Sequence, residues 1–133
     1  QMATLRDDAP LRDWLQDLTV PFTHNGHRIR ALDITGKDRP FLLAVADPVY
    51  AVAGITNQQL QRALRSSAWA KGGTAKQLSA RISRHLRLLR DHGLLRKMPN
   101  QRKYLLMEKG SKLTTALNAL LAASIQQLTE KVA

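Results

Sequence analysis

The longest amphipathic stretch of the chain, residues 74–92, constrains the fold more than any other feature. Apolar side chains recur along it at helical spacing, and cations and short polar side chains fill the opposite arc of the helical wheel. Gly93 follows directly, and glycine commonly ends helices because it accepts positive φ. The stretch therefore predicts a helix from about Thr74 to His92. Its inward face is expected to carry Ala75, Leu78, Ile82, His85, Leu86 and Leu89.

Three elements are expected before residue 50. A first helix, starting near Asp8-Ala9-Pro10 and ending before Pro21, is indicated by four residues at the spacing of one helical face: Leu11, Trp14, Leu15 and Leu18. Residues 20–32 predict a β-hairpin with Asn25-Gly26 at its turn, because both turn residues tolerate positive φ. A second helix is expected over about 38–46, where Asp47-Pro48 ends it and the buried residues are Phe41, Leu42 and Val45.

Further elements are expected on either side of the long helix. Thr56 is a favourable N-cap for a short helix over 57–65, in which Leu60, Ala63 and Leu64 face inward. Residues 66–73 are expected to form a flexible turn. After Gly93, two short strands, Leu94–Met98 and Arg102–Met107, are joined by Pro99-Asn100-Gln101, and a last helix covers about 108–131. The predicted fold class is mainly α with small β-hairpins.

Positive charge is concentrated after residue 50. Residues 1–50 hold six Lys or Arg and seven Asp or Glu, whereas residues 51–133 hold fifteen and three. A field this one-sided attracts polyanions. A surface that serves only to keep a protein soluble normally carries both positive and negative charges. We therefore expect a polyanion as the partner of the second part of the chain.

The basic helix and the hairpin after it form the candidate nucleic-acid site. A helix about 10–12 Å across fits the DNA major groove, which is about 12 Å wide. Arg81, Arg84 and Arg87 are expected to enter that groove, where an Arg can hydrogen-bond guanine O6 and N7. The other candidate contacts are Lys76, Gln77, Ser79 and Ser83 on the helix, and Arg96, Lys97, Arg102 and Lys103 on the hairpin. The alternative for the helix alone is a solvated amphipathic helix, and the adjoining basic hairpin favours binding.

A resemblance to a known superfamily rests on two segments. The run Arg87-Leu-Leu-Arg-Asp-His-Gly-Leu-Leu-Arg-Lys97, with Tyr104-Leu-Leu-Met-Glu-Lys-Gly110 after it, resembles the MarR and ArsR types of winged helix-turn-helix. The resemblance covers about 55–112 and implies a recognition helix at 79–92, a wing at 95–106 and DNA as the usual ligand. Met107 stands where the pattern has Thr, so an irregular start of the last helix is expected. The turn at 66–73 is also longer than in a compact helix-turn-helix.

A looser similarity concerns the whole chain. The order hairpin, helix, Gly54 to Leu60 and wing is similar to the C-terminal end of a family of long bacterial proteins, which implies that this chain is the DNA-contacting tail of a larger protein. The fact that the chain starts with Gln1 agrees with that interpretation. The implied organisation is a packing unit at 1–50, a winged helix-turn-helix at 51–112 and a C-terminal helix at 113–133. If the looser similarity holds, the protein is not a free-standing repressor. The function we expect overall is that of a transcriptional regulator or the DNA-contacting domain of a larger mobile-element protein.

Several interpretations stay open at this point. The last helix can pack on its own domain through its leucines, or it can form a homodimer seam through Leu121, Ile125, Leu128 and Val132, whose 4-3-4 spacing favours a partner. The basic face can dock an acidic protein, or it can bind RNA, which the small number of aromatic residues disfavours. Trp69 is expected to pack in the core or a loop, the alternative being stacking on a sugar or base beside Lys71.

Other classes of function lack support in the sequence. The chain has no cysteine, which excludes disulfides and thiolate metal sites and fits a reducing, cytoplasmic compartment. No apolar run approaches the roughly 20 residues of a membrane span. A metal site is not expected, since His24 and His27 fall on opposite faces of the hairpin unless the turn intervenes, His85 faces the core, and His92 is favoured as a cation at a helix end. Without paired carboxylates, a Ser-His-Asp set or a phosphate loop, neither an enzyme nor a cofactor is expected.

Overall fold

The computed structural model describes the chain from residue 16 to residue 132. Residues 16–18 are helical and Leu18 is buried, as the apolar spacing of the N-terminal segment predicts. Leu11, Trp14 and Leu15 lie outside the described residues. The remainder of the expected first helix is therefore still a prediction.

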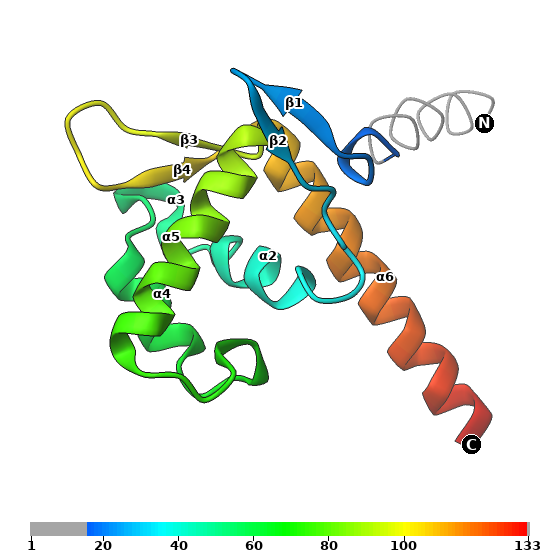
Figure 1. Cartoon of the computed structure of the whole chain (residues 1–133). Helices are drawn as coiled ribbons and strands as arrows, with labels where there is room; N and C mark the ends of the chain where they lie inside the picture. Colours follow the sequence, from blue (N-terminus) through cyan, green and yellow to red (C-terminus); the bar gives the residue numbers. More distant parts are fainter. Residues whose placement is uncertain (1–15, 133) are drawn as a thin grey trace.

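The described chain is largely helical and carries two small antiparallel hairpins (Figure 1). The first hairpin, β1 (Phe22–His24) and β2 (His27–Ile29), turns at Asn25-Gly26, both of which have positive φ as expected. The elements that follow are α2 (Arg39–Val45), α3 (Tyr50–Ala53), α4 (Asn57–Leu64), the 3-10 helix η1 (Ala68–Ala70), α5 (Ala75–Asp91), β3 (Leu95–Lys97), β4 (Tyr104–Leu106) and α6 (Glu108–Val132). The fold is thus a small helical one with hairpins, in agreement with the predicted class at this coarse level.

The second hairpin is tied to the segment before α4. β3 pairs with β4 so that Lys97 lies opposite Tyr104, and Tyr104 also forms an isolated bridge with Ile55. The bridge is closed by two backbone hydrogen bonds, Ile55 N to Tyr104 O at 2.7 Å and Tyr104 N to Ile55 O at 2.9 Å. The chain just before α4 therefore acts as a third, one-residue strand beside the β3–β4 hairpin.

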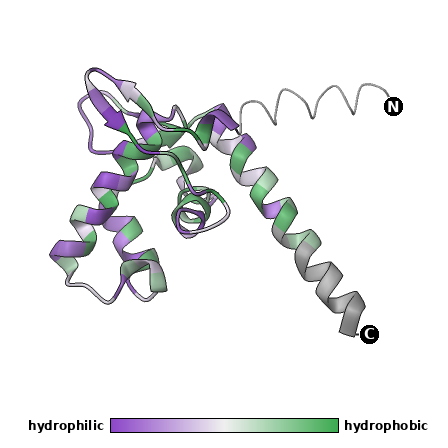
Figure 2. Cartoon of the chain, turned by 45° about the vertical axis from the view of Figure 1, so that its right-hand side comes forward, coloured by the Kyte–Doolittle hydropathy of each residue, from purple (hydrophilic) through white to green (hydrophobic). Residues whose placement is uncertain are grey.

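An apolar cluster joins the helices to the β3–β4 hairpin. Side chains with almost no exposure come from α2, α4, α5 and the start of α6, including Phe41, Leu60, Ile82 and Leu113. Hydrophilic and hydrophobic segments alternate along α4 and α5 in Figure 2, as expected for helices with one apolar face. α6 contributes Leu113 and Leu117 to the core and then runs away from the body of the molecule (Figure 1).

Three expectations about the packing were wrong, and one short helix was missed. Residues 66–73 are not simply a flexible turn, because η1 lies within them. The expected core packing of Trp69 is confirmed, since Trp69 is buried against Phe41 with ring centroids 5.1 Å apart. α3 was not predicted, because its four residues carry no periodic pattern of their own. Ala63 and Ala75 are exposed although both were expected to face inward. A helical wheel gives the direction in which a side chain points. It does not show whether neighbouring residues cover a side chain as small as that of alanine.

Gly110, the glycine that ends the second resemblance segment, is required by close packing. It lies in the first turn of α6, where a Cβ would come within 2.5 Å of the Leu94 carbonyl oxygen and 2.6 Å of Leu106 Cδ1. The same carbonyl accepts a hydrogen bond from Met107 N at 2.8 Å. The Met107 carbonyl in turn accepts from Ser111 N, so α6 begins regularly despite the absence of a threonine before it.

Replacing Gly110 with Ala is expected to lower the free energy of unfolding by about 1–3 kcal/mol, because an added methyl must displace backbone. Urea unfolding followed by circular dichroism measures the change. The matched control is Ser111→Ala, an exposed neighbour on the same helix, which should change the same quantity by less than about 0.5 kcal/mol. Equal stabilities of the Gly110 variant and the control would contradict the packing argument.

Candidate nucleic-acid interface

The outward face of α5 carries an exposed line of residues that we call the outer ridge: Lys76, Ala80 and Arg87. These positions are four and seven residues apart, and the exposed Arg84 lies beside them. Lys76, Arg84 and Arg87 form no ion pair with any acid among the described residues. Their charge is therefore directed to solvent, as the sequence predicts for this face.

Capping fixes where α5 begins. Thr74 Oγ1 accepts a hydrogen bond from Gln77 N, and Gln77 Oε1 accepts one from Thr74 N at 2.9 Å, so the two residues form a capping box. Gln77 was a candidate DNA contact, but its side-chain oxygen is already used at the helix terminus. The structure assigns this residue a structural role at the start of the helix.

The β3–β4 hairpin divides its cations between two faces. Lys97 and Arg102 are exposed and border the space beside α5, whereas Arg96 borders a different hollow together with α3 residues such as Tyr50. For Arg96 and Lys97, which are successive residues of β3, this division follows from the alternation of side chains along a strand. Lys103 is partly buried, and its Cβ lies against Gly54. Of the four candidate cations on this hairpin, the structure brings two to the side of α5.

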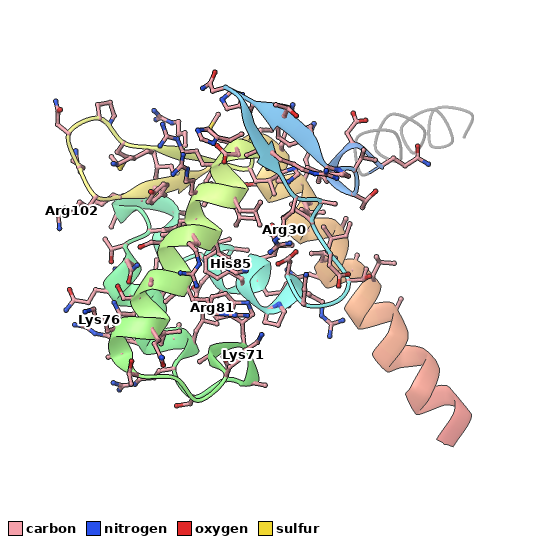
Figure 3. The ribbon with its side chains drawn as sticks, viewed as in Figure 1. Arg30, Lys71, Lys76, Arg81, His85 and Arg102 are labelled. Carbon is pink, nitrogen blue, oxygen red and sulfur yellow. The ribbon has the colours of Figure 1, made fainter. Side chains whose placement is uncertain are left out.

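A hollow of about 610 Å³, which we call the basic groove, separates α5 from the β3–β4 hairpin. Two cations of the hairpin, the N-terminal part of α4 and one side of α5 surround it, and none of its lining residues is acidic. Figure 3 shows Lys76 and Arg102 projecting on the same side of the molecule. The lining residues are Thr56, Asn57, Gln58, Gln61, Ser79, Ser83, Leu86, Lys97, Arg102 and Tyr104.

Asn57, which lines the basic groove, connects α4 to α5 through its side-chain hydrogen bonds. Its Nδ2 donates to the Ser79 carbonyl and to Ser83 Oγ, both at 2.8 Å, and its Oδ1 accepts from Gln61 Nε2 and from Ser79 Oγ. The candidate residues Ser79 and Ser83 therefore lie in the groove but are already bonded to α4. Asn57 was not identified from the sequence, because a position directly after the Thr56 cap gives no sign that its side chain hydrogen-bonds to a residue 22 positions later.

Arg81 does not join the outer ridge. Its guanidinium carbon lies 4.4 Å from the centroid of the Trp69 ring, and its Nε is buried without a hydrogen-bond partner among the described residues. In Figure 3 Arg81 and His85 point from α5 towards α2. This arrangement is a cation–π contact within the protein, so neither Arg81 nor the buried face of Trp69 is free to meet a base.

A buried carboxylate joins three separate parts of the chain. Asp38 is 2% exposed, and its two oxygens accept hydrogen bonds from the Arg30 guanidinium at 2.9 Å each. Asp33 N donates to the same carboxylate at 2.8 Å, and His85 Nε2 on α5 lies 3.6 Å away. Burial raises the pKa of the Asp38 carboxyl, but the hydrogen bonds outweigh burial and hold that pKa well below its usual range. The carboxylate therefore connects the end of the β1–β2 hairpin to α2 and α5.

His92 anchors the same hairpin at the other end of α5. Its Nε2 donates to the Arg30 carbonyl at 2.8 Å, and its ring meets the Phe22 ring edge-on, with centroids 5.1 Å apart. Burial lowers the pKa of His92, so the neutral ring is favoured. Burial of the ring therefore disfavours the cation that was expected at this helix end.

The histidines do not gather into a metal site in the part of the chain that the structure describes, where no group of three or more His, Asp or Glu could hold an ion. His24 and His27 are direct cross-strand partners and share one face of the β1–β2 hairpin. The turn intervenes between them, so the expectation of opposite faces does not apply.

Comparison of the chain with protein-family models, with curated proteins and with solved structures returned no match. Among the described helices, none combines the length and the apolar character that crossing a membrane requires.

Proposed function

We propose that the winged helix-turn-helix module expected at 51–112 also includes α2, so that its elements span residues 39–106. The order supporting it is a helix (α2), a one-residue strand at Ile55, two packed helices (α4 and α5) and the β3–β4 hairpin. In this proposal α5 is the recognition helix and the β3–β4 hairpin is the wing. The wing then lies beside the recognition helix, with the basic groove between them.

The ligand we propose is double-stranded DNA, with α5 in the major groove and the wing on the sugar–phosphate backbone. One observation carries this proposal: the exposed wing cations Lys97 and Arg102 border a groove beside α5 that no acidic residue lines, and the exposed cations of α5 lie on the adjoining face of that helix. An α-helix fits the major groove in width, and phosphates on its rim lie within reach of a flanking hairpin. Arg84 and Arg87 are the proposed base-reading residues, and Lys97 and Arg102 the proposed phosphate contacts.

The wider role we propose is that of a transcriptional regulator, or of the DNA-contacting domain of a larger mobile-element protein. A homodimer through α6 is part of this proposal, although the side chains of Leu121, Ile125, Leu128 and Val132 lie outside the described ones. Selection of bound duplexes from a random pool tests the dimer. A two-fold dimer selects a palindrome, whereas a single copy selects one half-site.

Two single substitutions are expected to affect binding differently. Arg84→Ala should cost about 1–3 kcal/mol of binding free energy on the selected sequence and relax preference at one base pair, because a base contact is lost.

Arg102→Ala should weaken binding to every sequence alike and lower the slope of log affinity against log salt by about one, because a phosphate contact is lost. Fluorescence anisotropy with selected and scrambled duplexes at several salt concentrations measures both effects.

The same titrations separate the proposal from its alternatives. Equal losses for both variants on every sequence would remove the claim that α5 reads bases. A wild-type chain that ignores duplex DNA but binds a polyacidic peptide would identify a protein-docking surface instead. Preference for structured RNA in direct competition would reassign the ligand.

A further inference from the structure

A second hollow lies on the other side of α5, between this helix and the β1–β2 hairpin. Its volume is about 250 Å³, and arginines from both elements line it: Arg28 and Arg30 from the first hairpin, and Arg84 and Arg87 from α5. The other lining residues are Ile29, His85, Leu88 and Asp91. Arg28 was not among the candidates suggested by the sequence, because it lies in the part of the chain whose net charge is slightly negative.

The two hollows flank the outer ridge. The basic groove is lined by Ser79, Ser83 and Leu86 of α5, and the second hollow by Arg84, Leu88 and Asp91. Each set has the spacing of one helical stripe. Since successive residues are about 100° apart around a helix, the stripe of the outer ridge falls between these two. Figure 1 shows the same arrangement, with the two hairpins on opposite sides of α5.

The β1–β2 hairpin is held firmly in this position. The Arg30 backbone carbonyl accepts from His92, and the Arg30 side chain forms the two hydrogen bonds with buried Asp38. Ile29 is buried, and Phe22, its cross-strand partner, packs on His92. The hairpin is thus fixed to the C-terminal half of α5 by contacts from both of its strands.

The charge left for a ligand in the second hollow is positive. Arg28, Arg84 and Arg87 are exposed, and none of them pairs with an acid in the described part of the chain. Arg30 is neutralised by Asp38, and Asp91 is the single acid that lines the hollow. Three free guanidinium groups against one half-buried carboxylate make a surface for anionic groups.

We propose that the β1–β2 hairpin is a second DNA-contacting arm, and that Arg28 binds a backbone phosphate on the strand opposite to the one held by Arg102. This inference rests on the proposed function. A helix inserted in the major groove has a phosphate backbone on each side, one from each strand. The chain places one cationic hairpin on each side of α5, so each hairpin meets a different strand.

The first test removes and adds charge on the arm. Arg28→Ala should lower the slope of log affinity against log salt by about one and weaken binding roughly tenfold at about 0.1 M salt. Thr23→Lys, at the position directly across from Arg28, should raise that slope by a similar amount. Because Thr23→Lys is expected to increase affinity, partial unfolding of that variant cannot account for the expected result. The matched control is Lys112→Ala, which removes the same charge from an exposed position on α6, outside both hollows.

The second test locates the contact on the duplex. Single methylphosphonate replacements in the selected site should reveal sensitive phosphates on both strands with the wild-type protein. Arg28→Ala should abolish the sensitivity on one strand, and Arg102→Ala that on the other. If Arg28→Ala and Thr23→Lys both behave like Lys112→Ala while Arg102→Ala weakens binding, the second arm is refuted and the proposed function stands. If the wild-type protein binds no duplex, the proposed function itself fails.

Discussion

Replacing Asp38 with Ala is expected to lower the free energy of unfolding by about 2–3 kcal/mol, the largest effect on stability from any single polar side chain described above. The substitution removes the two hydrogen bonds from Arg30 and leaves the Asp33 N–H without its acceptor. We place the loss below that of a fully buried ion pair, because the Arg30 side chain is 41% exposed and water can hydrate it again. Urea unfolding at neutral pH measures the change.

The same carboxylate should give the stability a characteristic pH dependence. The pKa of Asp38 is lower in the folded protein than the value of about 3.9 for an unfolded Asp, so its contribution is fully present above that value and is lost as the pH falls below it. Asp38→Asn should lack this part of the acid dependence between pH 5 and pH 2, roughly the window set by these pKa values. Asp17→Asn, an exposed control, should keep it. Parallel curves for the wild type and Asp38→Asn would refute this assignment.

The second large effect concerns binding. Replacing Lys76, Arg84 and Arg87 together with Ala should reduce affinity for the selected duplex by roughly two to three orders of magnitude at about 0.1 M salt. The reason is that the three cations form the face of α5 that enters the major groove in the proposed complex. The salt slope should fall by only about one, because Arg84 and Arg87 are proposed to contact bases and only Lys76 is left to contact a phosphate. Anisotropy titrations over a range of salt concentrations measure both quantities.

A control variant that loses the same amount of positive charge elsewhere tests whether the position of the cations on α5 matters. Lys37, Lys109 and Lys112 are exposed and lie outside both hollows, so their joint replacement with Ala removes the same charge from other surfaces. This variant should retain most of the affinity. Equal losses for the two triple variants would mean that the net charge of the whole chain, and not the surface around α5, attracts the duplex.

The sequence predicted the elements whose signals are local. α5 begins and ends within one residue of the expected limits, because the Thr74 cap and Gly93 act within a few residues of themselves. Asn25-Gly26 determines the turn of the first hairpin in the same way. The outer ridge could also be predicted, since helical periodicity alone separates Lys76 and Arg87 from the core.

The remaining details depend on contacts between distant segments. Arg81 and Arg84 look alike in the sequence, but Trp69 lies under the first and the second faces solvent. Ser79 and Ser83 could not be known to bond to Asn57, and Arg28 could not be placed beside α5. Each of these outcomes follows from how α4, η1 and the β1–β2 hairpin pack on α5, which no local pattern encodes.

The connections made by Asn57 and Asp38 have a consequence for the speed of association. Asn57 links α4 to α5, and the Ile55–Tyr104 bridge links the β3–β4 hairpin to the segment before α4. Asp38 links the end of the β1–β2 hairpin to α2. With both hairpins held before any ligand arrives, docking requires little ordering of backbone and loses little conformational entropy. The rate of complex formation is then governed by diffusional encounter in the field of the cations, and ionic strength should slow association more than it speeds dissociation. A duplex that reaches this protein therefore encounters a binding surface that is already formed.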